Sequence, residues 1–327
     1  MQTNKIFKLV LGAALCLSNM LVVNGVYAQS WPTKPIKFIV PYPPGGGTDV
    51  IARIVQEPLA KELGQQVIID NRGGAGGSIG SALAAQSPSD GYTVLFTLSS
   101  HTINPSFYPR LPFDTEKDFS PVVTIASLPQ ILVANPNFPA KNVKEVIEMA
   151  KAKPGSISYA SVGNGSPGHL AGAMMATDAG VDMVHIPYRG AGPAMNDLLA
   201  GQVDLEFDGL ATSAPQINAG KLVAIAVAAN KRSSAIPSVP TFQEAGLPDY
   251  VVSTWYSMFA PAGTPKPIVD KMIVEVQKAL NSPKLKSIWE KNGSETPNLY
   301  GEAFGKQVHA DVVRWSSVVK KSGASLD

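Results

Sequence analysis

The chain has 327 residues, of which 45% are hydrophobic, and it contains 29 glycines, 27 prolines and one cysteine. At about 150 residues per domain, this length predicts roughly two domains. The formal charge of +2 comes from 27 Lys and Arg against 25 Asp and Glu, and without Lys5 and Lys8 near the N-terminus the two totals are equal. A net charge near zero argues against a basic face of the kind that binds nucleic acid or a membrane surface.

The N-terminus has the pattern of a secretory signal peptide. Lys5 and Lys8 give it a positive start, residues 9–23 are mostly apolar, and small residues lead up to Ala28. The apolar part is too short to span a membrane comfortably. We therefore expect a signal peptide at 1–28, cleavage after Ala28 and export to a bacterial periplasm. The mature chain then has no cysteine, since the only one is Cys16.

The first strand expected in the mature chain leads into a glycine loop and a helix. Residues 36–40 are apolar with β-branched side chains, and prolines and three glycines follow at 41–47. Thr48 or Asp49 can cap the helix, which continues to about residue 63. Free N–H groups and the helix dipole favour negative charge at such a helix start. This stretch therefore indicates an anion site.

The later elements alternate between strand and helix, which is typical of α/β proteins with parallel sheets. Further strands are expected at 67–70, 92–97, 122–125, 130–134, 157–162, 183–187, 203–208 and 222–228. Helices are expected at 79–86, 143–152, 170–179, 193–200, 267–280, 283–292 and 302–319. Residues 105–121 are rich in proline and aromatic residues and are interpreted as an irregular segment.

Two crossing segments divide this pattern into two α/β lobes around a cleft. The crossings are expected near Leu128-Pro129 and at 251–260. They give one lobe made of 29–128 plus 254–327 and another made of 129–253. Open α/β sheets bind ligands at the carboxyl ends of their strands, and the glycine loops lie at such ends.

A second glycine loop follows the strand at 157–162. Gly163, Gly165 and Gly168 match the G-x-G-x-x-G pattern of dinucleotide sites. The acidic residue that would hold a ribose is missing from the end of the next strand, where Tyr188 and Arg189 stand. A loop whose N–H groups contact a small carboxylate is therefore the preferred interpretation, and His169 can add a hydrogen bond at the helix start.

Arg189 is the sharpest single candidate for binding an anion. It follows the strand at 183–187 and enters a glycine turn, where a guanidinium can bind a carboxylate through two parallel hydrogen bonds. An ordinary surface ion pair is an equally open interpretation. Asp208, at the end of the next strand, can orient Arg189, accept a ligand hydrogen bond or cap a helix. Replacing Arg189 with alanine is expected to cost about 2 kcal/mol or more of binding free energy.

The sequence gives little sign of catalytic chemistry. Ser78 lies in a G-x-S-x-G pattern, but residues 71–75 separate it from the preceding strand, whereas a nucleophile elbow needs a direct turn. The four histidines lack the spacing of a zinc site. We therefore expect no catalytic residues, no metal and no cofactor, and an exported hydrolase or an NAD(P)-linked protein is the disfavoured alternative.

Several stretches together resemble the Bug family of periplasmic solute receptors, the substrate-binding component of tripartite tricarboxylate transporters. They lie at 41–49, 71–78, 159–170, 185–199, 240–246 and 259–265 and cover essentially the whole mature chain. The resemblance implies a type II periplasmic-binding fold that closes over a small organic acid. It also implies that the loops at 43–49, 163–166 and 188–190 hold a carboxylate, partly through water, and it marks Thr48, Ser166, Arg189 and Asp208. Ala173-Met174 replaces an acidic position of many members, which favours an apolar or aromatic carboxylate over an amino acid.

We accordingly predict a monomeric, non-enzymatic periplasmic receptor that delivers a small carboxylate to membrane permease subunits. A ligand-sensing partner of a membrane kinase is the alternative that the sequence leaves open. The predicted ligand contacts come from the loops and strand ends: Tyr42, Pro44, Gly45, Gly46, Thr48, Asp49, Ser100, His101, Ser161, Gly163, Asn164, Ser166, His169, Tyr188, Arg189, Gly190 and Asp208.

Overall fold

The computed structural model describes residues 31–108, 110–291, 293–294 and 298–324, so the predicted signal peptide at 1–28 lies outside the described residues. The strands are β1 (Ile36–Val40), β2 (Val67–Asn71), β3 (Thr93–Leu98), β4 (Phe119–Ala134), β5 (Ser158–Ser161), β6 (Val184–Pro187), β7 (Leu205–Gly209), β8 (Val223–Val227) and β9 (Ser253–Pro261). The helices are α2 (Gly47–Leu63), the 3-10 turn η1 (Ala75–Gly77), α3 (Ser78–Ala85), α4 (Ser100–Phe107), α5 (Val143–Ala152), α6 (Pro167–Ala179), α7 (Ala191–Leu199), α8 (Leu210–Asn218), α9 (Lys266–Leu280), α10 (Pro283–Lys291) and α11 (Gly301–Ser322). Among the described residues, no helix is both long and apolar enough to cross a membrane.

The strands form one mixed sheet in the order β2-β1-β3-β9-β4-β7-β5-β6, with β8 also on β4. The outer pairs are parallel, whereas β9 is antiparallel to β3 and β4. The long strand β4 pairs with β9 up to Pro129 and with β7 from Gln130 onward. We name the part with β2, β1, β3 and β9 sheet A and the part with β7, β8, β5 and β6 sheet B. The expected α/β fold class is confirmed.

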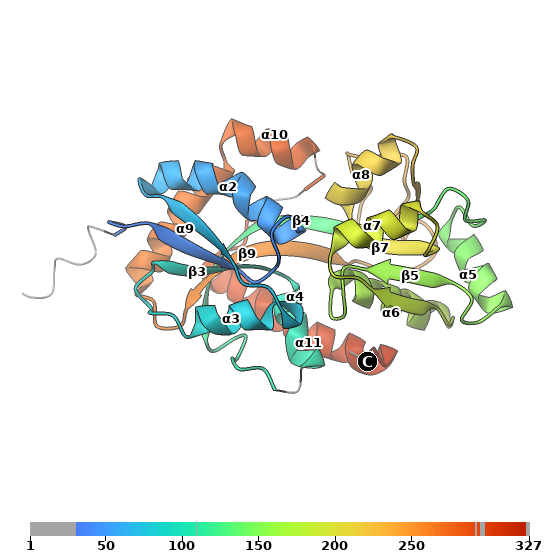
Figure 1. Cartoon of the computed structure of the whole chain (residues 1–327), viewed down its shortest axis with the longest axis horizontal. Coiled ribbons are helices and arrows are strands. Elements are labelled where there is room, and N and C mark those ends of the chain that lie inside the picture. The colour runs from blue at the N-terminus through green and yellow to red at the C-terminus, as the bar shows by residue number, and fades with distance from the viewer. Residues whose placement is uncertain (1–30, 109, 292, 295–297, 325–327) are drawn as a thin grey trace, which may run out of the picture.

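Helices cover both faces of each sheet, and Figure 1 shows α2 and α3 on opposite sides of sheet A. Ile51, Val55 and Leu59 of α2 follow a helical spacing and pack in the cluster that contains Phe38 and Phe96. On sheet B, α6 packs with the face that contains Phe207. The other face packs against α7 and α8, which leaves the side chains of Glu206 and Asp208 among apolar neighbours.

Two helices contact both parts of the molecule. Phe107 of α4 and Trp315 of α11 pack in the same cluster as Leu170 of α6. At the same time α11 is tied to sheet A, because Trp255 Nε1 donates to a carboxylate oxygen of Asp311 over 2.7 Å. Figure 1 shows α11 passing below both sheets. The two sheets are therefore linked by α4 and α11 as well as by the strands that cross between them.

Two predictions about the middle of the chain are wrong. The strands expected at 122–125 and 130–134 are one strand, β4, because Pro129 lies where the partner changes from β9 to β7 and its missing N–H is tolerated there. The start of the supposed irregular segment at 105–121 belongs to α4, which contains Pro105. Proline removes the bond that would reach the His101 carbonyl, but the Thr115 hydroxyl donates to that carbonyl instead, over 3.2 Å.

Candidate functional site

The loop at 43–46 and the first turn of α2 form the first part of the site. The helix begins at Gly47 after Gly46, and no side chain caps it, so the prediction that Thr48 or Asp49 caps this helix is wrong. Asp49 instead points back into the loop. One of its carboxylate oxygens accepts from the Gly45 N–H and from Arg53 Nε, each over 2.9 Å.

Asp49 also ties this loop to strand β2. The Asn71 amide donates to the second Asp49 oxygen over 3.0 Å and to the Tyr42 carbonyl over 3.1 Å. Burial acts to raise the pKa of Asp49, but the hydrogen bonds from Arg53, Gly45 and Asn71 outweigh it and hold the pKa below its usual value. Asp49 is therefore a charged group that holds the loop in place through hydrogen bonds, and its carboxylate oxygens are already paired.

Donors at the start of α2 are left open. In the part of the chain that the structure describes, the backbone N–H groups of Gly47 and Thr48 have no hydrogen-bond partner. The Thr48 hydroxyl is likewise buried and unpartnered. Unpaired N–H groups at a helix N-terminus, together with the helix dipole, attract anions. This turn can bind a carboxylate without a cationic side chain.

Two tyrosine hydroxyls lie against glycines next to sheet A, one near residues 76–77 and one beside Gly47. The Tyr42 hydroxyl lies 3.4 Å from the Gly76 carbonyl and close to the hydroxyls of Thr97 and Ser100, and burial raises the pKa of Tyr42 to about 12. The Tyr256 hydroxyl lies 2.9 Å from the position that a Cβ atom on residue 47 would occupy. Only glycine fits at position 47 without movement of Tyr256. Pro44 and Gly45 of the same loop are exposed.

The second glycine loop, at 162–166, which we call the closed loop, has its N–H groups hydrogen-bonded to acceptors in or next to the loop. The Gly163 N–H donates to the Ser161 hydroxyl, and the Gly165 N–H donates to His169 Nδ1, both over 3.2 Å. The Ser166 N–H donates to the Gly163 carbonyl over 3.2 Å. The Ser166 hydroxyl accepts from the His169 N–H and caps α6. These N–H groups are already paired, although the sequence pattern resembles that of the first loop.

A pair of histidines supports this closed loop. The rings of His169 and His185 stack with centroids 4.0 Å apart and planes 4° apart. His185 Nε2 lies 2.7 Å from the Ser161 hydroxyl. Burial lowers the pKa of His169 to about 4 and that of His185 to about 3, so both rings are neutral near pH 7. His169 accepts a hydrogen bond through Nδ1, whereas the sequence suggested that it donates one.

His101 lies away from these loops. Its ring is buried and contacts the rings of Phe113, Phe119 and Phe259, with centroids 5.5, 4.9 and 5.1 Å away. Burial lowers the pKa of His101 to about 3. The prediction that His101 contacts a ligand is not supported, because the ring points from α4 into the core of sheet A.

The strand ends of sheet B place Arg189 and Asp208 in different roles. Arg189 is exposed and has no partner among the described residues, whereas the Tyr188 hydroxyl donates to Asp197 over 2.8 Å. Asp208 is buried and accepts from the hydroxyls of Thr212 and Ser213 in the first turn of α8. Asp208 therefore holds the start of α8 and does not orient Arg189. Gly190 precedes α7 with a φ of +121°, which favours glycine.

Glu206 is a feature that sequence reasoning missed. It is fully buried, and neither of its carboxyl oxygens has a hydrogen-bond partner among the described residues. Burial, with a smaller contribution from nearby Asp208, raises its pKa to about 9. Glu206 is therefore neutral at pH 7.

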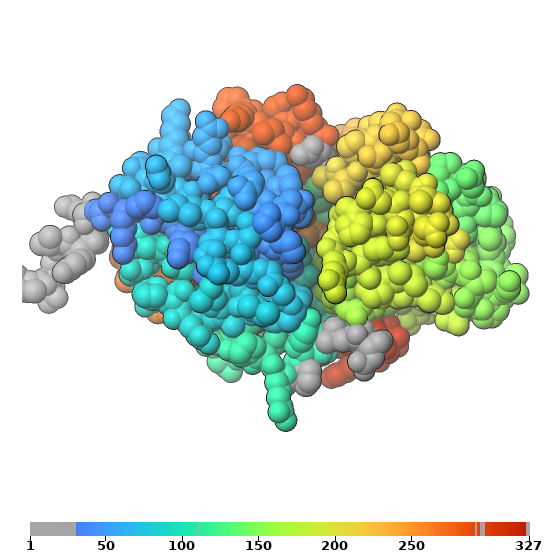
Figure 2. Space-filling model, viewed as in Figure 1, coloured from blue at the N-terminus to red at the C-terminus, as the bar shows by residue number. Residues whose placement is uncertain are grey.

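The η1 turn and the second glycine loop come close to each other through α4. The Asn104 amide donates to the Gly76 carbonyl over 3.0 Å, and a Cβ on Gly165 would lie 3.6 Å from the Phe107 ring and 3.8 Å from the Asn104 side chain. Figure 2 shows a furrow between the blue surface of sheet A and the yellow-green surface around α7. The sequence offered no signal for Asn104 or Thr97. Tyr256 lies in the predicted crossing segment but was not singled out there.

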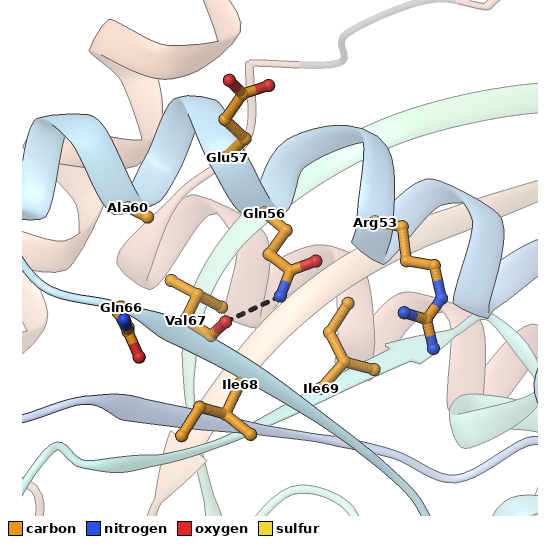
Figure 3. Close-up of a pocket in the computed structure, with 8 residues that line it drawn as sticks. All are labelled: Arg53, Gln56, Glu57, Ala60, Gln66, Val67, Ile68 and Ile69. Atoms are coloured by element: carbon orange, nitrogen blue, oxygen red, sulfur yellow. Dashed lines mark hydrogen bonds between the residues drawn. The ribbon is translucent and has the colours of Figure 1, made fainter.

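A separate groove of about 530 Å³ lies between α2 and the edge strand β2 (Figure 3). Gln56 Nε2 donates to the Val67 carbonyl there over 2.7 Å, and Arg53 lies at one end of the groove. This groove is on the outer edge of sheet A and not between the sheets. Ser78, the serine of the hydrolase alternative, donates its hydroxyl to the Ala75 carbonyl over 2.8 Å.

The sequence matches the family described as "Tripartite tricarboxylate transporter family receptor" over residues 51–324. It is 38% identical over 292 residues to the UPF0065 protein of the tcbD-tcbE intergenic region of Pseudomonas sp. (strain P51), which covers 89% of this chain and 87% of that protein. It is 36% identical over 304 residues to protein BugT of Bordetella pertussis, which covers 92% of this chain and 93% of that protein.

Solved structures show the same fold. A structure titled as a periplasmic transporter aligns with a TM-score of 0.85 at 42% identity, over 91% of this chain and 100% of that one. R. palustris Rpa4515 with adipate gives 0.85 at 33% identity, over 90% and 99% of the two chains. MatC of Rhodopseudomonas palustris with bound malate gives 0.82 at 32% identity, over 88% and 100%. These relatives are solute-binding receptors and not enzymes. The resemblance seen in the sequence is confirmed, and the chain belongs to the Bug family of tripartite tricarboxylate transporter receptors.

Proposed function

We propose that this protein is a monomeric periplasmic receptor for a small organic acid, which it delivers to membrane permease subunits. The observation that carries the proposal is the start of α2, where the N–H groups of Gly47 and Thr48 and the Thr48 hydroxyl have no partner among the described residues. An anion there gains several hydrogen bonds and the favourable end of the helix dipole. The adipate and malate bound in two related structures support a carboxylate as the ligand class.

The ligand selects a closed form by contacting both sides of the site. We propose lobes of 29–128 with 254–327, and of 129–253, that close around a carboxylate held at α2. Arg189 is the proposed contact from the second lobe, since its guanidinium is exposed and unpaired within the described chain. A ligand that contacts both lobes binds the closed form more tightly and shifts the population toward it. Closure also has to bend or displace α4 and α11, because both helices contact both sheets.

A thermal-shift screen tests the proposal on the mature chain. The ligands are adipate, malate, benzoate and nicotinate, each paired with its uncharged amide. We expect at least one acid to raise the unfolding temperature in a concentration-dependent way, since a ligand at about 100 times its Kd stabilises the fold by about 2.7 kcal/mol. The matching amide is expected to give a much smaller shift. If acids and amides act alike, or if no acid acts, the proposed anion site is wrong.

A further inference from the structure

We propose that Tyr256 is a further ligand-binding residue, whose phenol hydroxyl donates a hydrogen bond to the carboxylate held at the start of α2. This inference rests on the proposed function, because it names one more contact of the same site. Tyr256 comes from β9, which is neither of the glycine loops. It would bring a donor from the middle of the mixed sheet.

The position of the phenol is fixed by its strand. Tyr256 pairs with Leu98 of β3 on one side and with Ala126 of β4 on the other, so its backbone lies in the interior of the mixed sheet. Its side chain is half-buried, and its hydroxyl lies 2.9 Å from where a Cβ on Gly47 would be. The hydroxyl therefore lies beside the open N–H groups of the α2 turn.

The hydroxyl has no hydrogen-bond partner among the described residues. The hydroxyl is not among the fully buried atoms that lack a partner, so an acceptor from a ligand can reach it. The nearby Asp208 does not serve, since one of its oxygens takes the hydroxyls of Thr212 and Ser213 and no bond to Tyr256 is formed. The phenol is a donor without an acceptor, beside backbone donors that also lack one.

The same conclusion follows from the unpartnered Thr48 hydroxyl. This side chain is 1% exposed and belongs to the same turn of α2. The backbone N–H groups and the Thr48 hydroxyl of this turn, and the phenol beside Gly47, thus all lack an acceptor in the described chain. A carboxylate oxygen is the type of group that can accept from all of them.

The charge state of the phenol suits this role. Burial and the proximity of Asp208 and Tyr42 raise the pKa of Tyr256 above its usual value. The phenol therefore stays protonated across the physiological range and remains a donor. A hydrogen bond to a carboxylate is stronger than one to a neutral carbonyl, so the phenol favours an acid over its amide.

The test compares two phenylalanine variants of the mature chain, with adipate and malate as ligands. Tyr256→Phe removes the hydroxyl and keeps the ring. Tyr92→Phe is the matched control, because the Tyr92 hydroxyl only contacts exposed Thr33. We expect Tyr256→Phe to weaken binding about 10-fold or more in calorimetry, and Tyr92→Phe to change it less than about twofold. The loss should be smaller for the monoamide of the same acid.

A second measurement guards against a folding effect. The unliganded melting temperature of Tyr256→Phe is measured, and wild-type protein carrying ¹³Cζ-tyrosine is titrated with the acid. The resonance that is missing in Tyr256→Phe should move on binding. If the wild type binds and Tyr256→Phe binds equally well, or if that resonance stays still, Tyr256 is not a contact and the proposed function stands. If no carboxylate binds the wild type, the proposed function and this inference are both overturned.

Discussion

The loop before α2 and the loop before α6 share a design but differ in what their N–H groups do. Each links a parallel strand to a helix through several glycines. In the first, the carboxylate of Asp49 in α2 accepts from the Gly45 N–H, and the N–H groups of Gly47 and Thr48 have no partner in the described chain. In the second, the Gly163 and Gly165 N–H groups donate to the side chains of Ser161 and His169, so these donors are already paired within the protein.

The difference teaches that a glycine loop at a helix start is not sufficient for an anion site. The side chains around it decide whether its donors remain available. The buried acids Asp49, beside the first loop, and Glu206, in sheet B, also differ in their hydrogen bonds and charge. Asp49 is charged and fully engaged, whereas Glu206 is buried without a partner among the described residues and its pKa is raised to about 9. The proposed carboxylate contact therefore falls on the first loop, whereas the second loop pairs its N–H groups internally.

The largest expected effect concerns Glu206. The native state keeps a proton that the unfolded chain releases above the usual glutamate pKa of 4.5, so stability should fall as pH rises from about 4.5 toward about 9. Glu206→Gln removes this dependence. Relative to the wild type, the free energy of unfolding of the variant should therefore rise by about 1.4 kcal/mol per pH unit above pH 4.5, which is of order 3 kcal/mol at pH 7.

Urea unfolding of both proteins at pH 5, 6, 7 and 8 measures this difference. Asp208, whose pKa is also raised by burial, is present in both chains and cancels. Parallel stability curves for the two proteins would show that Glu206 is ionised in the fold.

The next effect concerns the open loop. Gly47→Ala places a Cβ 2.9 Å from the Tyr256 hydroxyl, so either the turn or the phenol has to move. We expect a loss of about 2 kcal/mol of binding free energy, roughly 30-fold in Kd, with a smaller loss of stability. Gly192→Ala is the control, because nothing lies within 4 Å of a Cβ at that position. Equal ligand affinity for both variants would place the ligand elsewhere.

The smallest effect concerns the closed loop. Ser166→Ala removes the cap of α6 and should cost about 1 kcal/mol of folding stability, with less than a threefold change in affinity. Ser87→Ala, which loses only an exposed bond to the Leu83 carbonyl, should change neither. A large loss of affinity at unchanged stability would instead make Ser166 a ligand contact.

Local signals in the sequence were enough for the fold class and for the two glycine loops. Apolar runs, glycines and turn residues act over a few positions, and the elements built from them were predicted. The helices α4 and α8 were both missed, and each contains a proline. In α4 the hydroxyl that replaces the lost bond comes from Thr115. The family resemblance supplied the receptor function, which composition and spacing alone left open.

The roles within the site depend on contacts between distant residues. Asp49 was predicted as a cap or a ligand contact, but Asn71, 22 residues away, makes it part of a network. His101 follows a strand that leads to the site, yet its ring points into a cluster of phenylalanines. No pattern in the sequence tells which face of a short helix such a side chain takes. Tyr256 was missed because the sequence does not tell toward which helix start a side chain of β9 points.

The most direct test of the central claim is an NMR titration of ¹⁵N-labelled mature protein with an acid that binds. If the carboxylate is held at the start of α2, the amide protons of Gly47 and Thr48 should move strongly downfield, as expected for new hydrogen bonds to an anion. The amide protons of Gly163 and Gly165 should move little, because their partners are Ser161 and His169. Large downfield shifts at Gly163 and Gly165, with Gly47 and Thr48 unchanged, would contradict this account.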